Sequence, residues 1–146
     1  TNGEYSDLKI ICNGATYKVH RLILCSQINF FERACKGSWR ASAIDLSHDD
    51  SYAVGAMIRY AYRDHYGPAE NLDPEEQVLR HVHVHAIAAK YNIPGLQTMA
   101  KDYLKILVAE HWDKDWFADI IRSIYETTIS SDRGLRDVVV DMIMEH

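Results

Sequence analysis

Three histidines at alternate positions, His81, His83 and His85, form the one segment of this sequence that could hold a metal ion. Imidazole is the commonest zinc ligand in proteins. On a strand all three would point the same way, whereas on a helix only His81 and His85 share a face. Apolar neighbours at helical spacing favour the helix, and the aspartate and further histidines of metal hydrolases are missing. We therefore expect partly exposed helical histidines near a surface or interface, with a histidine-bound metal site as a distant alternative.

The other reactive residues do not form a recognisable catalytic motif. No serine occupies a Gly-x-Ser-x-Gly setting, and Cys25 and Cys35 lie without an evident activating base. Phosphate-binding, dinucleotide-binding and calcium-binding loops are also missing from the sequence. Asp7 and His20 fall near the start of two predicted strands, where a carboxylate and an imidazole can satisfy each other as a structural pair. We expect no catalytic residue, no cofactor and no enzymatic activity.

Bulk composition bounds the class of protein. The chain has 146 residues, enough for one domain with a core, and a net charge of −5 that argues against direct nucleic-acid binding. No apolar run approaches the roughly 20 residues of a membrane span. Three sparse cysteines, Cys12, Cys25 and Cys35, predict reduced core thiols and a cytoplasmic or nuclear location. Because the first residue is Thr1, we expect a domain from a longer protein.

Local patterns predict a few short strands followed by many helices. Two strands should flank the turn signal Asn13-Gly14, and two short helices should follow before Gly37. A third strand is expected over residues 43–46, and the carboxylates of Asp49 and Asp50 supply cap candidates for the next helix. Apolar residues at helical spacing predict the remaining helices, which lie over residues 54–62, 78–93, 96–107, 113–125 and 135–143. These helices carry more apolar surface than one small sheet can cover, which leaves some for a partner.

Several of these segments, in this order, resemble the BTB/POZ domain. The likeness begins with Ser6-Asp7 and continues through most of the chain, at residues 17–21, 24–31, 44–46, 57–62 with Tyr66, and 88–96. Later residues resemble the helical extension of fungal BTB proteins, namely Trp112, Phe117, Tyr125, Asp132-Arg133 and Leu135-Arg136.

This resemblance implies a helix-rich α+β fold in which a small mixed sheet of about three strands is capped by a helical cluster. It also implies a division into a BTB/POZ domain over residues 1–110 and a helical extension over residues 111–146 that packs on it. A non-enzymatic role in protein–protein interaction follows from the family. BTB domains homodimerise, bridge to a cullin-3 ubiquitin ligase, or recruit transcriptional corepressors. We expect a homodimer or weak self-association first, and a cullin-3 adaptor or a co-regulator scaffold as alternatives.

Two departures from the family bear on these alternatives. Only residues 1–6 come before the first expected strand, whereas long-form members carry an extra N-terminal helix and strand that swap across the dimer. Either that region lies outside the given sequence or this is a short form, so a swapped dimer does not follow from the resemblance. The hydrophobic–x–Glu element of cullin-binding members corresponds to Trp39, Arg40 and Ala41, where the glutamate is lost. An aromatic beside an arginine is typical of binding hot spots. The predicted partner-binding residues are Trp39, Arg40, Ala41, Tyr62 and Tyr66.

Overall fold

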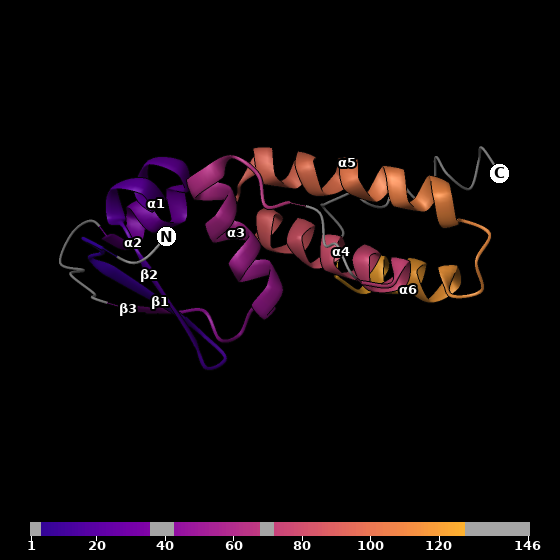
Figure 1. Ribbon diagram of the computed structural model, residues 1–146, viewed down its shortest axis with the longest axis horizontal. Helices are drawn as coiled ribbons and strands as arrows, with labels where there is room; N and C mark the ends of the chain where they lie inside the picture. The colour runs from indigo at the N-terminus through magenta and orange to yellow at the C-terminus, as the bar shows by residue number, and fades with distance from the viewer. Residues whose placement is uncertain (1–3, 36–42, 68–71, 128–146) are drawn as a thin grey trace.

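The computed structural model describes residues 4–35, 43–67 and 72–127 (Figure 1). One end of the molecule holds the sheet and the first three helices, and the later helices extend away from it. The predicted last helix, at 135–143, and the predicted contact residues 39–41 lie outside the described residues.

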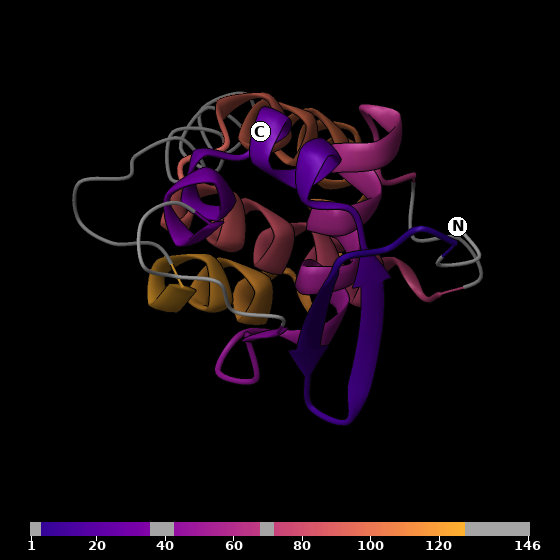
Figure 2. The ribbon, with the colours of Figure 1, turned by 90° about the vertical axis from the view of Figure 1, so that its left-hand side faces the viewer.

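Three short strands form a mixed sheet in the order β2-β1-β3, with bounds β1 Leu8–Cys12, β2 Ala15–Val19 and β3 Ala43–Asp45. The β1–β2 pair is antiparallel and β1–β3 is parallel. Asn13 and Gly14 both have positive φ, at 49° and 89°, which confirms the tight turn predicted from this dipeptide. The hairpin projects from the body of the molecule in Figure 2.

Two short helices follow the hairpin, α1 at Arg21–Gln27 and α2 at Asn29–Cys35. After β3, helix α3 spans Ser51–Arg63 and packs against both α1 and α4. The side chain of Asp50 accepts a hydrogen bond from the backbone N–H of Ala53 at 2.9 Å, so the predicted acidic cap is confirmed. Most of helix α3 is buried, because small and apolar residues recur along nearly its whole length.

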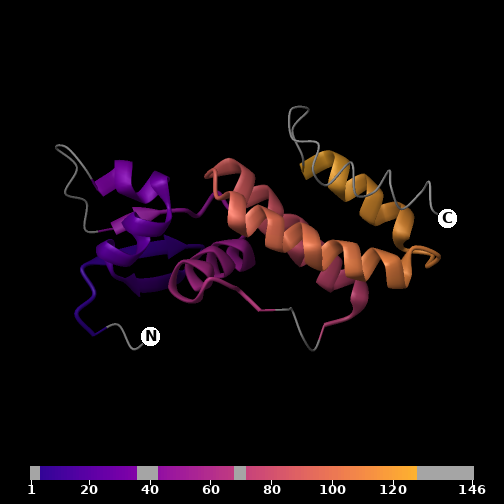
Figure 3. The same cartoon turned by 90° about the horizontal axis from the view of Figure 1, so that it is seen from above.

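The second half of the described chain is helical. Helix α4 spans Pro74–Lys90, α5 spans Pro94–His111, and α6 spans Phe117–Thr127. Helices α4 and α5 run side by side, and α6 packs on α4 (Figures 1 and 3). The predicted break between the helices at 78–93 and 96–107 is present, and Pro94 starts α5 directly after the turn that follows α4. A proline suits this place because the first helical N–H has no intrahelical partner.

The hydrophobic core has two parts. The larger part joins the sheet to α1–α3 and to the facing ends of α4 and α5, with Leu24 and Phe31 fully buried in it. The smaller part consists of Val78, Val82, Leu104 and Ile120 and holds α6 against α4 and α5.

This architecture confirms the predicted helix-rich α+β fold with a small three-stranded mixed sheet. The predicted boundary at residue 110 stays a prediction.

Candidate functional site

The junction between β2 and α1 is fixed by a histidine with two partners. The backbone N–H of His20 donates to the Tyr62 hydroxyl at 2.9 Å, and Nδ1 of the same histidine lies 2.7 Å from that hydroxyl. Its Nε2 lies 2.7 Å from the carbonyl oxygen of Glu4. Asp7 instead accepts from the backbone N–H of Arg21 at 2.8 Å. The predicted direct pairing of Asp7 with His20 is therefore corrected: each side chain has a different partner, and both hold the strand-to-helix junction.

Two large apolar side chains are exposed beside this junction. Leu22, in the first turn of α1, is 83% exposed, and Tyr5, next to Glu4, is 88% exposed. The contact between the Glu4 carbonyl and the His20 ring links the segment that carries Tyr5 to the residue that precedes α1. Sequence reasoning did not single out Leu22, although the apolar run in α1 has more residues than one buried face needs. This junction is a surface on which a fixed backbone presents apolar groups to solvent.

The two predicted contact tyrosines occupy different environments. Tyr62 is half-buried and bonded to His20, and burial is the main cause that raises the pKa of its hydroxyl. Tyr66 is only 5% exposed and lies in the core, where its ring contacts those of His81 and Tyr103. In this conformation the Tyr66 side chain is not available to a partner, so its burial does not support the predicted contact.

The histidine segment is helical, as predicted, but its exposure differs from the prediction. His81 and His85 are 1% and 0% exposed, because α4 is covered on several sides by neighbouring elements. The Tyr66 hydroxyl lies 2.5 Å from Nδ1 of His81, and the Tyr103 ring stacks on the imidazole at 4.8 Å and 17°. Burial lowers the pKa of His81 from 6.5 to about 4. His81 is therefore a neutral core residue at physiological pH.

Metal-binding and membrane-spanning features are not found in the part of the chain that the structure describes. There, no three His, Cys, Asp or Glu side chains gather as a metal site would require. Within the same ranges no helix is long and apolar enough to span a bilayer. The described thiols of Cys12 and Cys25 are not in disulfides.

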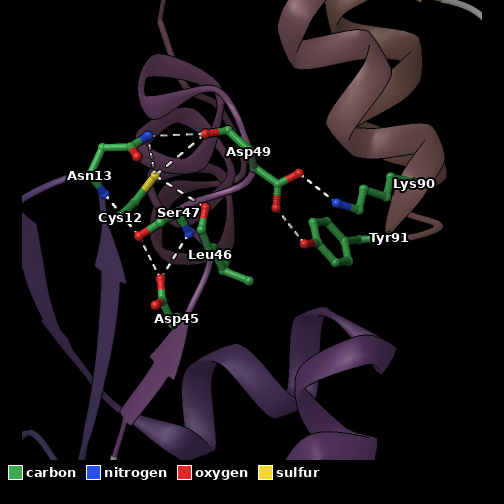
Figure 4. Close-up of polar contacts among 8 residues, drawn as sticks. All are labelled: Cys12, Asn13, Asp45, Leu46, Ser47, Asp49, Lys90 and Tyr91. Carbon is green, nitrogen blue, oxygen red and sulfur yellow. Dashed lines mark hydrogen bonds and ion pairs between the residues drawn. The ribbon is translucent and has the colours of Figure 1, made fainter.

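A polar network joins the sheet to the C-terminal end of α4 (Figure 4). Asp49 accepts hydrogen bonds from Lys90 Nζ at 2.7 Å and from the Tyr91 hydroxyl at 2.5 Å. The buried thiol of Cys12 donates to the Leu46 carbonyl at 3.3 Å on the other side of the same loop. Burial, followed by the hydrogen bond to Asp49, raises the pKa of Tyr91, so the phenol stays protonated and donates. This network is structural.

Helix α5 offers a second apolar surface. A shallow groove with a volume of about 290 Å³ runs along it, and Ile106 in this groove is 59% exposed. All residues that line this groove belong to α5, whereas Leu22 belongs to α1. Its lining residues are Gly95, Thr98, Met99, Asp102, Tyr103 and Ile106.

Comparison with known families agrees with this architecture. The sequence model of the BTB/POZ domain matches residues 1–107, well over half of the chain. The chain belongs to the BTB/POZ family. This family consists of protein-interaction modules, so BTB/POZ membership places the chain among proteins that bind other proteins.

Curated relatives carry the same domain in much longer chains. BTB/POZ domain-containing protein 9 of Rattus norvegicus is 29% identical over 105 residues, which cover 69% of this chain and 16% of the relative. The protein of the same name from Homo sapiens is 28% identical over the same length. The chain thus spans about 16% of the length of the curated relatives it matches.

Proposed function

We propose that this BTB/POZ domain is a non-enzymatic module that self-associates and recruits protein partners, and that its self-association surface lies at the β2–α1 junction. The observation that carries the proposal is the 83% exposure of the Leu22 side chain. Leu22 lies in the first turn of α1, where Asp7 accepts a hydrogen bond from the backbone N–H of Arg21. Fully burying a leucine contributes about 1.5–3 kcal/mol. Tyr5, on the segment whose Glu4 carbonyl contacts His20, is a second exposed large side chain linked to this junction.

Leu22→Asp is expected to weaken self-association by at least about tenfold, because a carboxylate replaces an apolar contact and must be desolvated in the interface. Light scattering across a concentration series measures the change. The wild-type mass should rise with concentration, whereas the variant should stay near the monomer mass.

Ile106→Asp is the matched control, since it places the same charge on an exposed apolar position of α5. It should associate like the wild type. A wild-type chain that remains monomeric at high micromolar concentration would contradict the proposal, and so would equal weakening by both variants.

A second candidate is a substrate adaptor for a cullin-3 ubiquitin ligase, favoured by the aromatic Trp39 at the position that resembles the family's hydrophobic–x–Glu element. A hydrogen bond to a charged group is worth about 1.5–3 kcal/mol, and Ala41 in place of glutamate removes one such contact. Trp39→Ala should then reduce recovery of cullin-3 in a pull-down several-fold. Equal or absent recovery of cullin-3 with the wild type and the variant would remove this candidate.

A co-regulator scaffold in the nucleus is a third role for the same self-associating module.

A further inference from the structure

Two arginines from different helices lie over one tyrosine ring. The guanidinium carbon of Arg59, on α3, is 5.5 Å from the centre of the Tyr52 ring, and that of Arg80, on α4, is 5.0 Å from it. A cation within about 6 Å of an aromatic face is attracted by the ring. Tyr52 is half-buried on α3. Its ring therefore contacts one guanidinium group from α3 and one from α4.

A third donor approaches the same place from the sheet. The Nη1 atom of Arg59 lies 3.2 Å from the position that a Cβ atom on Gly55 would occupy, and the Tyr17 hydroxyl lies 3.1 Å from it. The missing side chain of Gly55 therefore lets a guanidinium from α3 and a hydroxyl from β2 converge. The Nε atom of Arg59 donates to the Tyr66 carbonyl at 3.3 Å, which fixes the plane of the guanidinium group.

Neither arginine has a hydrogen-bonded carboxylate in the described part of the chain. The nearest carboxylate to Arg80 is that of Glu76, whose Oε2 is 3.9 Å from Nε, beyond hydrogen-bond distance. No ion pair is found for Arg59 among the described residues. The buried Nε atom of Arg80 has no hydrogen-bond partner, and Arg59 Nε donates to a backbone carbonyl, so neither guanidinium group is bonded to a carboxylate within the described ranges. They form a local site at which an anion would gain charge-assisted hydrogen bonds.

We propose that Tyr52, Arg59 and Arg80, together with the Tyr17 hydroxyl, bind the carboxylates of an acidic peptide segment in a protein partner. This inference rests on the proposed function, since it names the chemistry of a partner that the module recruits. The paired N–H donors of a planar guanidinium group match the two oxygens of a carboxylate. A tyrosine ring beside them offers apolar area to the aliphatic part of an acidic side chain. A peptide is the source we choose because the family binds proteins.

The test is fluorescence anisotropy with a labelled peptide of alternating glutamate and glycine, compared with its glutamine counterpart, at low salt. Arg80→Gln is expected to weaken binding of the glutamate peptide by about tenfold or more, the scale of one charge-assisted hydrogen bond. Arg122→Gln is the control, because it removes the same charge from a side chain of α6 that is 71% exposed. It should change the affinity less than about twofold if the fixed site, and not net charge, binds the peptide.

Arg59→Lys is the second variant, because it keeps the positive charge and removes the paired N–H donors of the guanidinium group. It should also weaken binding of the glutamate peptide. Circular dichroism on each variant checks that the fold is retained. The inference is overturned if the glutamate peptide does not bind, if the glutamine peptide binds equally well, or if Arg80→Gln and Arg122→Gln have the same effect. Inorganic phosphate that binds more tightly than the peptide would overturn the choice of a peptide partner.

Self-association of Arg80→Gln, measured by light scattering, separates this inference from the proposed function. It should match the wild type, because Leu22 lies on α1 and the arginines lie on α3 and α4. A chain that self-associates but does not bind the peptide overturns the acidic-peptide site alone.

Discussion

Asp49→Ala is expected to lower the free energy of unfolding by about 2–4 kcal/mol, because it removes a nearly buried acceptor with two donors. The Asp49 side chain is 11% exposed, and it bridges Lys90 and Tyr91 at the end of α4. The Tyr91 bond supplies most of the loss, since the residue is 8% exposed and its hydroxyl would be left without this acceptor. The Lys90 side chain is 53% exposed, so its pairing adds at most about 1 kcal/mol.

Urea denaturation of the wild type and the variant measures this difference. A double-mutant cycle with Tyr91→Phe should give a coupling free energy of about 1.5 kcal/mol or more. Asp102→Ala, which removes an exposed carboxylate from α5, is the control and should change stability by less than about 0.5 kcal/mol. A loss below about 1 kcal/mol for Asp49→Ala would show that the loop does not depend on this network.

Acid is expected to destabilise the wild type through His81. The pKa of this histidine falls from 6.5 to about 4 on folding, so the unfolded chain binds the proton more readily than the folded chain. Its contribution is fully present above pH 6.5 and is lost as the pH falls from 6.5 toward 4. The difference in pKa corresponds to a total loss of about 3 kcal/mol at most. Protonation would also place a hydrogen on both ring nitrogens, so Nδ1 could then only donate to the Tyr66 oxygen.

His81→Asn tests this expectation, because the amide oxygen can accept from Tyr66 and does not titrate. The variant is less stable in absolute terms, since it loses the stack on Tyr103. The measured quantity is therefore the slope of unfolding free energy against pH between 4 and 6.5, which should be shallower than in the wild type. His65→Asn, the same substitution at an exposed position, is measured beside it as the control. Equal slopes in the wild type and His81→Asn would contradict the assignment.

Local signals in the sequence determined much of the fold. Asn13-Gly14 specified the hairpin because both residues tolerate positive φ, and Asp50 specified the start of α3 because its carboxylate caps the helix. Apolar periodicity placed α4 and α5, although α4 ends at Lys90 and α5 begins at Pro94, a few residues from the predicted bounds. For α6 the predicted start at residue 113 was four residues early, since residues before Phe117 form turns. The ordered set of such segments was enough to indicate the family.

Side-chain environments were less accessible from the sequence. The spacing of His81 and His85 predicted a shared helix face, but it did not show that neighbouring elements cover that face completely. The sequence suggested that Asp7 and His20 pair, because their charge and position are complementary. In the structure the His20 imidazole contacts the hydroxyl of Tyr62 on α3 instead. A partner 42 residues away leaves no periodic signal near the histidine.

What the sequence by itself determined, then, is the succession of strands and helices and the BTB/POZ membership, because turns, caps and periodicity depend on neighbouring residues. Only the tertiary structure decided which groups meet or remain exposed. It placed Leu22 in solvent, buried Tyr66, and brought Arg59 and Arg80 to the ring of Tyr52. The physical reason is that burial and contact across elements depend on how distant segments pack, which no local pattern encodes.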